Sequence, residues 1–329
     1  MATPNDTVSE ALSLALSERS SGLVDLVSIS TPLLDRMRRN GQFSAYSGPT
    51  IRERIEYARS GTYTRYTGWE FLNIKPSEQI TEAEWLPKMA AVTVALSGRD
   101  ILDNRGRNQL MNIMTQRIDS AEKELEEEFY KDLHSDGTAD GGRQITGLRA
   151  AIPIVNDVGI YAGIDRAKWP MWRTGSYDIS DGDIPGVSSV ADMDKVYKYV
   201  LSQHVLGRKG PDMILASGDH YAAFEETLLP IQRIQGSGTA TAGFTGLKVA
   251  IAGRTIDVFL EGGIGSAMPT GTSYVLDSSA LSYRYNAGRN FEPFGGRKAP
   301  LNQDGVIQHL GFMGELTMKN PRGIAVITT

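Results

Sequence analysis

The longest helical pattern in the chain runs from Gly106 to Leu133, and after its first residue no glycine or proline interrupts it. Its apolar residues recur every three or four positions and so share one face of a helix. They are Leu110, Met114, Ile118, Ala121, Leu125, Phe129 and Leu133. Such a helix would be about 40 Å long, well beyond the ~11–12 residues of an average one. We therefore expect other elements to be arranged along it; an ordinary long core helix is the alternative.

The composition is that of a folded protein without a strongly basic surface. The 329 residues are 40% hydrophobic and 22% charged, enough for about two domains. A net charge of -5 excludes a strongly basic nucleic-acid-binding surface. The chain has no cysteine, which excludes disulfides, thiolate metal sites and a cysteine nucleophile. We find no signal peptide and no long apolar window, so we expect a protein made in the cytoplasm.

A polar segment rich in aromatic residues precedes the long helix. Residues 51–57 are typical of a polar strand, and a return strand is predicted at 89–96. The connection between them carries Arg59, Tyr63, Arg65, Tyr66, Trp69 and Phe71. A hairpin of this kind cannot bury its aromatic residues within itself, so we expect it to bury them against a neighbour. Stacking of single-stranded nucleic acid on the rings is the alternative, which Glu53, Glu56 and Glu70 disfavour because they repel phosphates.

After the long helix the pattern changes to alternating helices and strands. From about residue 156 to 275 we expect a compact α/β module with a mixed sheet, in which a second helix ends at Leu229–Pro230. Ile256, Val258 and Leu260 are expected to alternate inward on one of its strands. The last 50 or so residues are typical of strands, which need a helix to cover one face. The long helix is the available cover, so its domain would be discontinuous in sequence.

The sequence contains no recognisable catalytic or metal-binding constellation. Its four histidines lie far apart and lack metal-ligand spacing; they are His134, His204, His220 and His309. Asp178, Asp181 and Asp183 lack the order of a calcium loop, so a solvated loop is the preferred interpretation. The glutamates of the long helix point in several directions and solvate its outer face, where Glu127 and Lys131 have ion-pair spacing. We therefore expect no enzyme, and no catalytic, cofactor-binding or metal residue.

The order of these parts, together with four short strings, carries a family resemblance. The strings are Ser97-Gly98-Arg99-Asp100-Ile101-Leu102, Leu133-His134-Ser135-Asp136-Gly137-Thr138, Gly163-Ile164-Asp165-Arg166-Ala167 with Trp169 and Trp172, and Asn302-Gln303-Asp304. Over essentially its whole length the chain resembles the major capsid proteins of tailed bacteriophages, which have the Hong-Kong-97-type (HK97-like) fold.

The resemblance implies an α+β fold in five parts. These are an N-terminal arm at 1–45, an E-loop hairpin with its return strand at 46–97, a P-domain with the spine helix at 98–150, an α/β A-domain at 151–275, and returning P-domain strands at 276–329. It also implies a major capsid protein whose hexamers and pentamers self-assemble into an icosahedral shell around phage double-stranded DNA. Arg59, Tyr63, Arg65, Tyr66, Trp69 and Phe71 would then lie at the assembly interface, because the E-loop lies across the adjacent subunit in this family.

The same resemblance sets the expected partners and location. The partners are further copies of the chain, a portal, a decoration protein and a separate scaffolding protein, since the chain begins almost at the arm. Contact with packaged DNA is expected to be weak and non-specific, and no membrane or cofactor is expected. The location would be the virion, after assembly in the cytoplasm of a bacterial host. A crosslink is not expected, since Lys75, Lys88, Asn302 and Asn320 match the required types but not the motif. The alternatives are an encapsulin-like bacterial compartment shell and an α/β enzyme with an extended hairpin.

Overall fold

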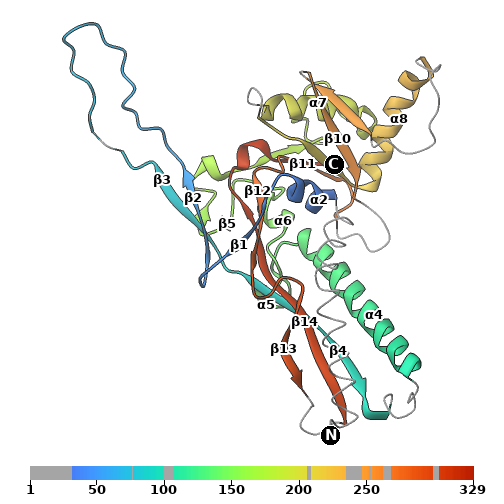
Figure 1. Cartoon of the computed structure of the whole chain (residues 1–329). Helices are drawn as coiled ribbons and strands as arrows, with labels where there is room; N and C mark the ends of the chain where they lie inside the picture. The colour runs from blue at the N-terminus through green and yellow to red at the C-terminus, as the bar shows by residue number, and fades with distance from the viewer. Residues whose placement is uncertain are drawn as a thin grey trace.

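The computed structural model describes residues 32–75, 77–99, 107–205, 209–234, 247–251, 253–261, 268–298 and 304–329. Within these ranges, the side chains of 107–115, 229–234 and 296–298 fall outside the description. Most of the predicted N-terminal arm, residues 1–31, also lies outside the described residues, as does the second half of the string at 97–102. The described chain has an elongated body from which a long hairpin projects (Figure 1).

The lower half of the body is a five-stranded sheet with one long helix beside it (Figure 1). Its strands are β1 (Phe43–Tyr46), β4 (Lys88–Ser97), β12 (Leu281–Asn286), β13 (Glu292–Lys298) and β14 (Gly305–Met318). The central strand is β14, which pairs antiparallel with β4, β12 and β13. Strand β1 joins the edge by pairing parallel with β12. Segments far apart in the sequence therefore build this sheet, as expected for a discontinuous domain.

The predicted long helix is confirmed as α4 (Arg107–Leu133). Its buried side chains are those of the expected stripe, Ile118, Ala121, Leu125, Phe129 and Leu133; Leu110 and Met114 lie outside the described side chains. Phe129 packs edge-on against Tyr283, Phe291 and Phe312, which belong to the β12–β14 region. Lys131 Nζ donates to Glu128 Oε1 at 2.5 Å, three residues away, and Glu127, the expected partner, acts on Lys131 as a nearby charge.

The upper half of the body is the predicted α/β module with a mixed six-stranded sheet. Its strand order is β7 (Gly175–Asp178), β15 (Ala325–Thr328), β11 (Thr272–Leu276), β8 (Met213–Ala216), β10 (Arg254–Leu260) and β9 (Lys248–Ile251). The helices α7 (Met193–His204) and α8 (Gly218–Ile234) pack against it. The smaller elements are α5 (Ala139–Gly142), α6 (Leu148–Ala151), β5 (Ile160–Tyr161), β6 (Ile164–Asp165), and the 3-10 turns Pro170–Trp172, Val190–Asp192 and Pro321–Gly323.

Three details of this module differ from the sequence expectations. Leu260 is 47% exposed rather than inward, because β9 pairs only with the first half of β10 and leaves the end of that strand uncovered. Helix α8 continues past Pro230 to Ile234, since a proline removes one backbone donor without necessarily ending a helix. The last strand, β15, pairs with β11 and β7 instead of joining β12 and β14. The end of the chain thus returns to the upper sheet.

The projecting hairpin consists of β2 (Ile51–Glu56) and β3 (Ile80–Trp85), paired antiparallel from Ile51↔Trp85 to Glu56↔Ile80. The strand predicted at 89–96 exists as β4, but the prediction that it closes the hairpin is wrong. Strand β4 pairs with β14 over ten residues, and β3 takes its place opposite β2. Alternation shows which face of a strand is buried but does not identify its neighbour. The projecting part therefore consists of the two short strands β2 and β3 and the long loop that joins them.

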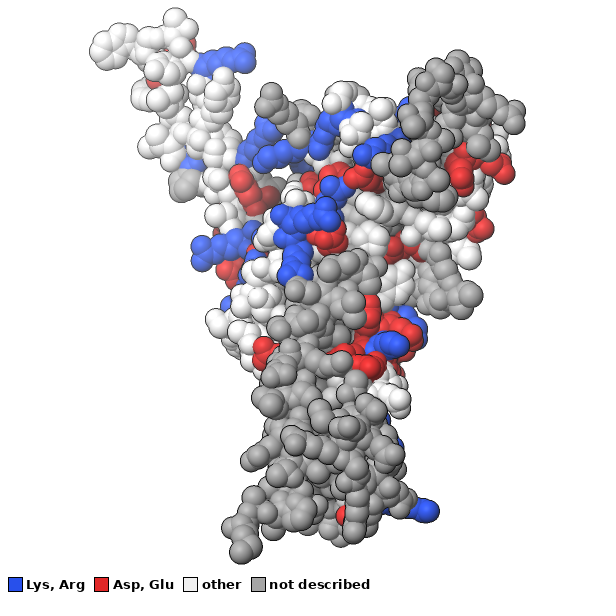
Figure 2. Space-filling view, turned by 45° about the vertical axis from the view of Figure 1, so that its right-hand side comes forward, with Lys and Arg blue, Asp and Glu red and all other residues white. Residues whose placement is uncertain are grey.

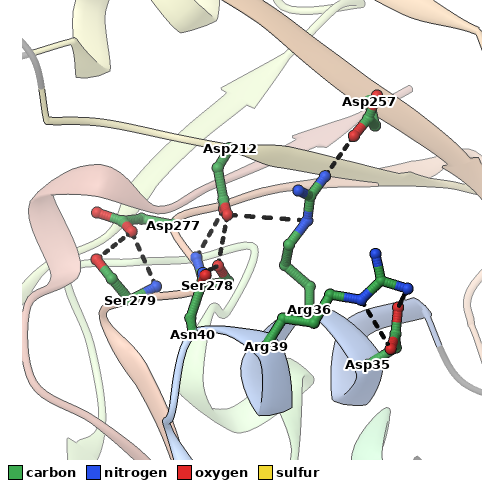
Figure 3. Close-up of polar contacts among 9 residues, drawn as sticks. All are labelled: Asp35, Arg36, Arg39, Asn40, Asp212, Asp257, Asp277, Ser278 and Ser279. Carbon is green, nitrogen blue, oxygen red and sulfur yellow. Dashed lines mark hydrogen bonds and ion pairs between the residues drawn. The ribbon is translucent and has the colours of Figure 1, made fainter. Parts of the chain in front are cut away.

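Helix α2 (Pro32–Arg39) lies at the junction of the two sheets (Figure 3). Its apolar residues Leu33, Leu34 and Met37 are buried in the larger core. Arg36 reaches the upper sheet, where its guanidinium donates to the carboxylate of Asp257 and lies 4.0 Å from that of Asp212. Just after the helix, Asn40 Nδ2 donates to Ser278 Oγ at 2.6 Å, on the chain between β11 and β12. The helix thus connects both halves of the body.

Replacing Arg36 by methionine is expected to lower the free energy of unfolding by about 1–2 kcal/mol, because it leaves two partly buried carboxylates without this cation. Arg39→Met is the matched control on the same helix. Arg39 is 74% exposed and, among the described residues, forms its ion pair with Asp35, one turn away, so its loss should cost less than about 0.5 kcal/mol. Urea unfolding of both variants would measure the difference. Equal losses would show that Arg36 does not connect the two halves.

Candidate assembly interface

The loop between β2 and β3, residues 57–79, forms the tip of the hairpin. At its entrance Tyr57 N donates to Gln79 O at 2.9 Å. Farther out, Ser77 Oγ donates to Ser60 O at 3.0 Å, and Asn73 Nδ2 donates to Gly61 O at 3.3 Å. These bonds join the outgoing and returning legs of the loop. In the described part of the chain, the hydrogen bonds of residues 58–78 all stay within the loop, so its shape is set locally.

The six residues expected at an interface all lie in this tip and are exposed. Trp69 and Phe71 are fully exposed, at 104% and 102%, and Tyr63 and Tyr66 are largely so. Arg65 Nε lies 3.4 Å from the Tyr63 hydroxyl, to which it donates. Figure 2 shows the tip standing clear of the body, with mostly uncharged atoms on its surface. The structure therefore brings all six residues together on one projecting surface.

Sequence reasoning missed two further apolar residues of this surface, Leu72 and Ile74, and the adjoining Ile80 at the start of β3, all of which are exposed. The signal was present in the sequence, because Leu72 and Ile74 follow Phe71 in a segment without core-like periodicity. An aromatic side chain buries about 150–250 Å² on docking, so at ~25 cal/mol per Å² each ring offers roughly 4–6 kcal/mol before ordering costs. Monomeric soluble proteins rarely leave so much contiguous apolar surface uncovered. The tip is therefore suited to a protein partner.

The ionisable groups of the body are engaged in structural contacts. His134 Nε2 lies 3.3 Å from Glu261 Oε1, and both side chains are buried. His220 Nδ1 contacts Ser273 Oγ at 2.8 Å, and burial lowers the pKa of His220 to about 4, so it is neutral near pH 7. His204 contacts the Tyr177 hydroxyl, and His309 contacts Thr93 Oγ1. Each histidine thus has a different partner, and the four do not converge on one place.

The described residues form neither a metal site nor a membrane-spanning helix. No group of three or more histidine, cysteine, aspartate or glutamate side chains is placed to hold a metal ion within the described ranges. In the same part of the chain, no helix is both long and apolar enough to span a membrane. The carboxylates of Asp178 and Asp183 accept hydrogen bonds from backbone N–H groups of their own loop. The hairpin tip is therefore the surface with the clearest functional character.

No protein-family model and no curated protein sequence matches the chain. Its architecture nevertheless matches solved shells over most of its length. A chain of the cyanophage A-1(L) capsid is 15% identical, with a TM-score of 0.52, covering 87% of this chain and 90% of that one. The capsid of a native GTA particle matches at 12% identity and a TM-score of 0.53, covering 89% of each chain. A chain of the satellite phage P4 procapsid matches at 9% identity and 0.51, covering 94% and 90%.

The chain has the HK97-like fold. At these identities the likeness is one of fold, and it confirms the α+β architecture expected from the sequence. Within the HK97-like fold, α4 corresponds to the expected spine helix and the β2–β3 hairpin to the expected E-loop. The tip residues 57–79 are then the outer end of that loop.

Proposed function

We propose that this chain is the major capsid protein of a tailed bacteriophage. Copies of it would form hexamers and pentamers that close an icosahedral shell around double-stranded DNA. The observation that carries this proposal is the exposed apolar tip of a hairpin on an HK97-like body. A side chain as exposed as Trp69 or Phe71 gains nothing from the fold of its own subunit, but it gains burial when a second copy covers it. The role is structural rather than catalytic.

The proposal extends to the parts of the subunit and to its partners. Residues 1–45 would be the arm, 46–97 the E-loop with its return strand, 98–150 and 276–329 the P-domain, and 151–275 the A-domain, with β15 lying in the A-domain sheet. A scaffolding protein, a portal and a decoration protein are the proposed partners besides other copies. A net charge of -5 supports weak, non-specific contact with packaged DNA, because it supplies little counterion release. The proposed location is the virion, after assembly in the host cytoplasm.

The decisive experiment is particle assembly by the purified full chain, alone and with a scaffolding protein, followed by light scattering and negative-stain microscopy. We expect megadalton particles from the unaltered chain. Trp69→Ala should lower the particle yield while leaving the helicity by circular dichroism unchanged, because Trp69 is fully exposed in the subunit. Leu260→Ala is the control, an exposed apolar residue on β10 far along the chain from the hairpin, and it should assemble normally.

Two results would count against the proposal. If the chain stays a stable monomer under all assembly conditions, the proposed capsid function is excluded. Parallel loss of yield and helicity in Trp69→Ala would place Trp69 in the core of the subunit instead of at an interface. The contents of particles made in cells separate the two kinds of shell: co-purifying DNA supports a capsid, and co-purifying enzyme cargo in its place supports a bacterial compartment shell.

A further inference from the structure

Glu315 lies at the root of the hairpin, where the hairpin strands join the lower sheet. It is fully buried on β14, and the residue before it, Gly314, pairs with Lys88, the first residue of β4. Strand β3 ends at Trp85 and continues into β4 after a link of two residues (Figure 1). On the opposite edge of β14, Glu315 pairs with Arg284 of β12. A buried carboxyl group therefore lies where the hairpin meets the body.

Only one oxygen of this carboxyl group has hydrogen-bond donors among the described residues. Oε1 accepts the backbone N–H groups of Thr146 and Leu316, whereas Oε2 is buried without a partner in that part of the chain. A carboxylate in such a place would carry a charge that the surrounding groups do not match, so burial favours the protonated form. The same burial raises the pKa of Glu315 to about 8. The folded subunit therefore holds a proton on Glu315 at neutral pH.

Two cations on the neighbouring strands are held by other acceptors. Lys88 Nζ donates to Gly142 O at 2.5 Å, although its charge already opposes the effect of burial on the pKa of Glu315. The guanidinium of Arg284 donates to Glu53 Oε1 in β2, and its Nε is buried without a partner among the described residues. Side chains opposite each other in a ladder have Cβ atoms about 4.5–5.5 Å apart. Loss of the proton would therefore present a buried carboxylate to two cations that now hold other groups.

The tyrosines beside Glu315 do not titrate in the same range. Tyr161 on β5 and Tyr283 on β12 both feel the charge of Glu315 and are both buried. Burial raises the pKa of each hydroxyl group above the usual value for tyrosine, which is about 10. Among these side chains, Glu315 is therefore the one expected to change its charge near pH 8.

The groups around Glu315 also attach the hairpin to the body. On the outgoing strand, the ion pair of Arg284 with Glu53 joins β2 to β12. On the returning strand, Trp85 at the end of β3 packs edge-on against Tyr161 at a centroid distance of 5.9 Å. The cation at the start of β4 follows directly after the two-residue link. A change of charge at Glu315 would therefore act on the contacts of both hairpin strands.

We propose that Glu315 is a pH switch that sets the angle between the hairpin and the body. With the proton bound, Arg284 and Lys88 keep their present acceptors, and the hairpin stands as described. When the proton is lost to solvent, the carboxylate competes for both cations, so Glu53 and Gly142 O lose their donors. The hairpin then turns about its short links to the body, as a hinge does. The switch belongs to the single subunit and does not depend on the proposed function.

The absence of cysteine allows spin labels to be placed at chosen sites of the full-length chain. Glu56→Cys with Lys123→Cys puts one label on β2 and one on α4, both at exposed positions. Double electron–electron resonance would give the distance between the labels at intervals from pH 6.5 to pH 9.5. We expect the mean distance to shift with a midpoint near pH 8. Lys123→Cys with Leu260→Cys labels two sites of the body and should show no shift.

Two glutamine variants of the labelled chain test whether Glu315 is the titrating group. Glu315→Gln should keep the low-pH distance at every pH, because the amide oxygen accepts the same backbone N–H groups without ionising. Glu127→Gln, at an exposed position of α4, is the matched control and should shift like the unaltered chain. The infrared C=O stretch of a protonated carboxyl group provides a second readout. It should disappear with the same midpoint as the distance shift and be absent from Glu315→Gln.

The two readouts decide the inference even if Glu315→Gln does not fold. In the unaltered chain, a distance that stays constant while the infrared band disappears would overturn the switch, because Glu315 would then titrate without moving the hairpin. Different midpoints for the band and the distance would overturn it as well, as would an equal distance shift in Glu315→Gln. None of these measurements requires particles, so particle assembly tests the proposed function separately.

Discussion

Phe129→Ala is expected to lower the free energy of unfolding of the subunit by about 3–5 kcal/mol, the range for removing a fully buried phenylalanine ring. Phe129 is 2% exposed and lies on the buried stripe of α4. Its ring centroid is 5.6, 5.2 and 5.0 Å from those of Tyr283, Phe291 and Phe312, all at nearly perpendicular angles. Truncation would remove three edge-to-face contacts and leave a cavity that surrounding rings cannot collapse to fill.

Urea unfolding of the purified subunit, followed by circular dichroism, would measure this loss as a lower midpoint. The chain offers a matched control in Phe71→Ala, which removes the same ring from a fully exposed position. That variant should unfold within about 0.5 kcal/mol of the unaltered chain. If the two substitutions cost the same, the ring of Phe129 would not be a core element and α4 would not be held to the sheet in this way.

Glu315 is expected to make the stability of the subunit depend on pH. Its carboxyl group is fully buried on β14, where Oε1 accepts the backbone N–H groups of Thr146 at 2.7 Å and of Leu316 at 3.2 Å. Burial raises the pKa of Glu315 to about 8, although these bonds and the nearby Lys88 oppose the shift. Tyr161 and Tyr283 also face it, and burial keeps both in the neutral form. The folded chain therefore holds a proton on Glu315 at neutral pH.

The sign of the effect follows from linkage. Below the ordinary pKa of 4.5 both the folded and unfolded states bind the proton, and the group's contribution to stability is fully present. Between pH 4.5 and about 8 only the folded state binds it, so stability falls as pH rises. The limiting slope is about 1.4 kcal/mol per pH unit. Above pH 8 the folded state releases the proton as well and the loss ends.

Glu315→Gln is expected to remove this slope, because the glutamine oxygen can accept the same backbone N–H groups without becoming charged. Urea unfolding at intervals from pH 5 to pH 9 would give the slope for each protein. Glu127→Gln is the control, an exposed glutamate on α4 whose replacement should leave the profile unchanged. An identical pH dependence in Glu315→Gln and the unaltered chain would mean that Glu315 is already ionised in the folded state.

Local periodicity was enough to predict the elements but not their partners. The stripe on α4 could be predicted because a helix repeats its contacts every three to four residues whatever it packs against. The strands β4 and β15 were also predicted in position, yet both were assigned to the wrong neighbours. Pairing of β4 with β14 joins residues about 200 positions apart, and period-two alternation carries no information about so distant a partner. The sequence therefore predicted which helices and strands are present, whereas only the structure showed which strands pair.

In the candidate site, too, some features could be predicted from the sequence and others could not. The exposure of Trp69 and Phe71 could be expected, because a hairpin of two short strands has no interior. The exposure of Val155, Val158 and Ile160 could not be, since these residues look like core residues in sequence. The burial of Glu315 could not be predicted either, because a glutamate looks like a surface residue in sequence. Its strand gives no sign that β12 pairs beside it and that the loop at Thr146 lies against its carboxyl group.

The long ladder between β14 and β4 bears on how the body would respond to force. Ten consecutive residues pair from Gly305↔Ser97 to Gly314↔Lys88, and the two strands run antiparallel. A pull along the strand axis loads all of these pairs together, so they must yield at once. A pull across the strands opens them one after another. The lower sheet is therefore stiffest against stretching along its length, which is the direction of tension within a wall if β14 lies in the plane of that wall.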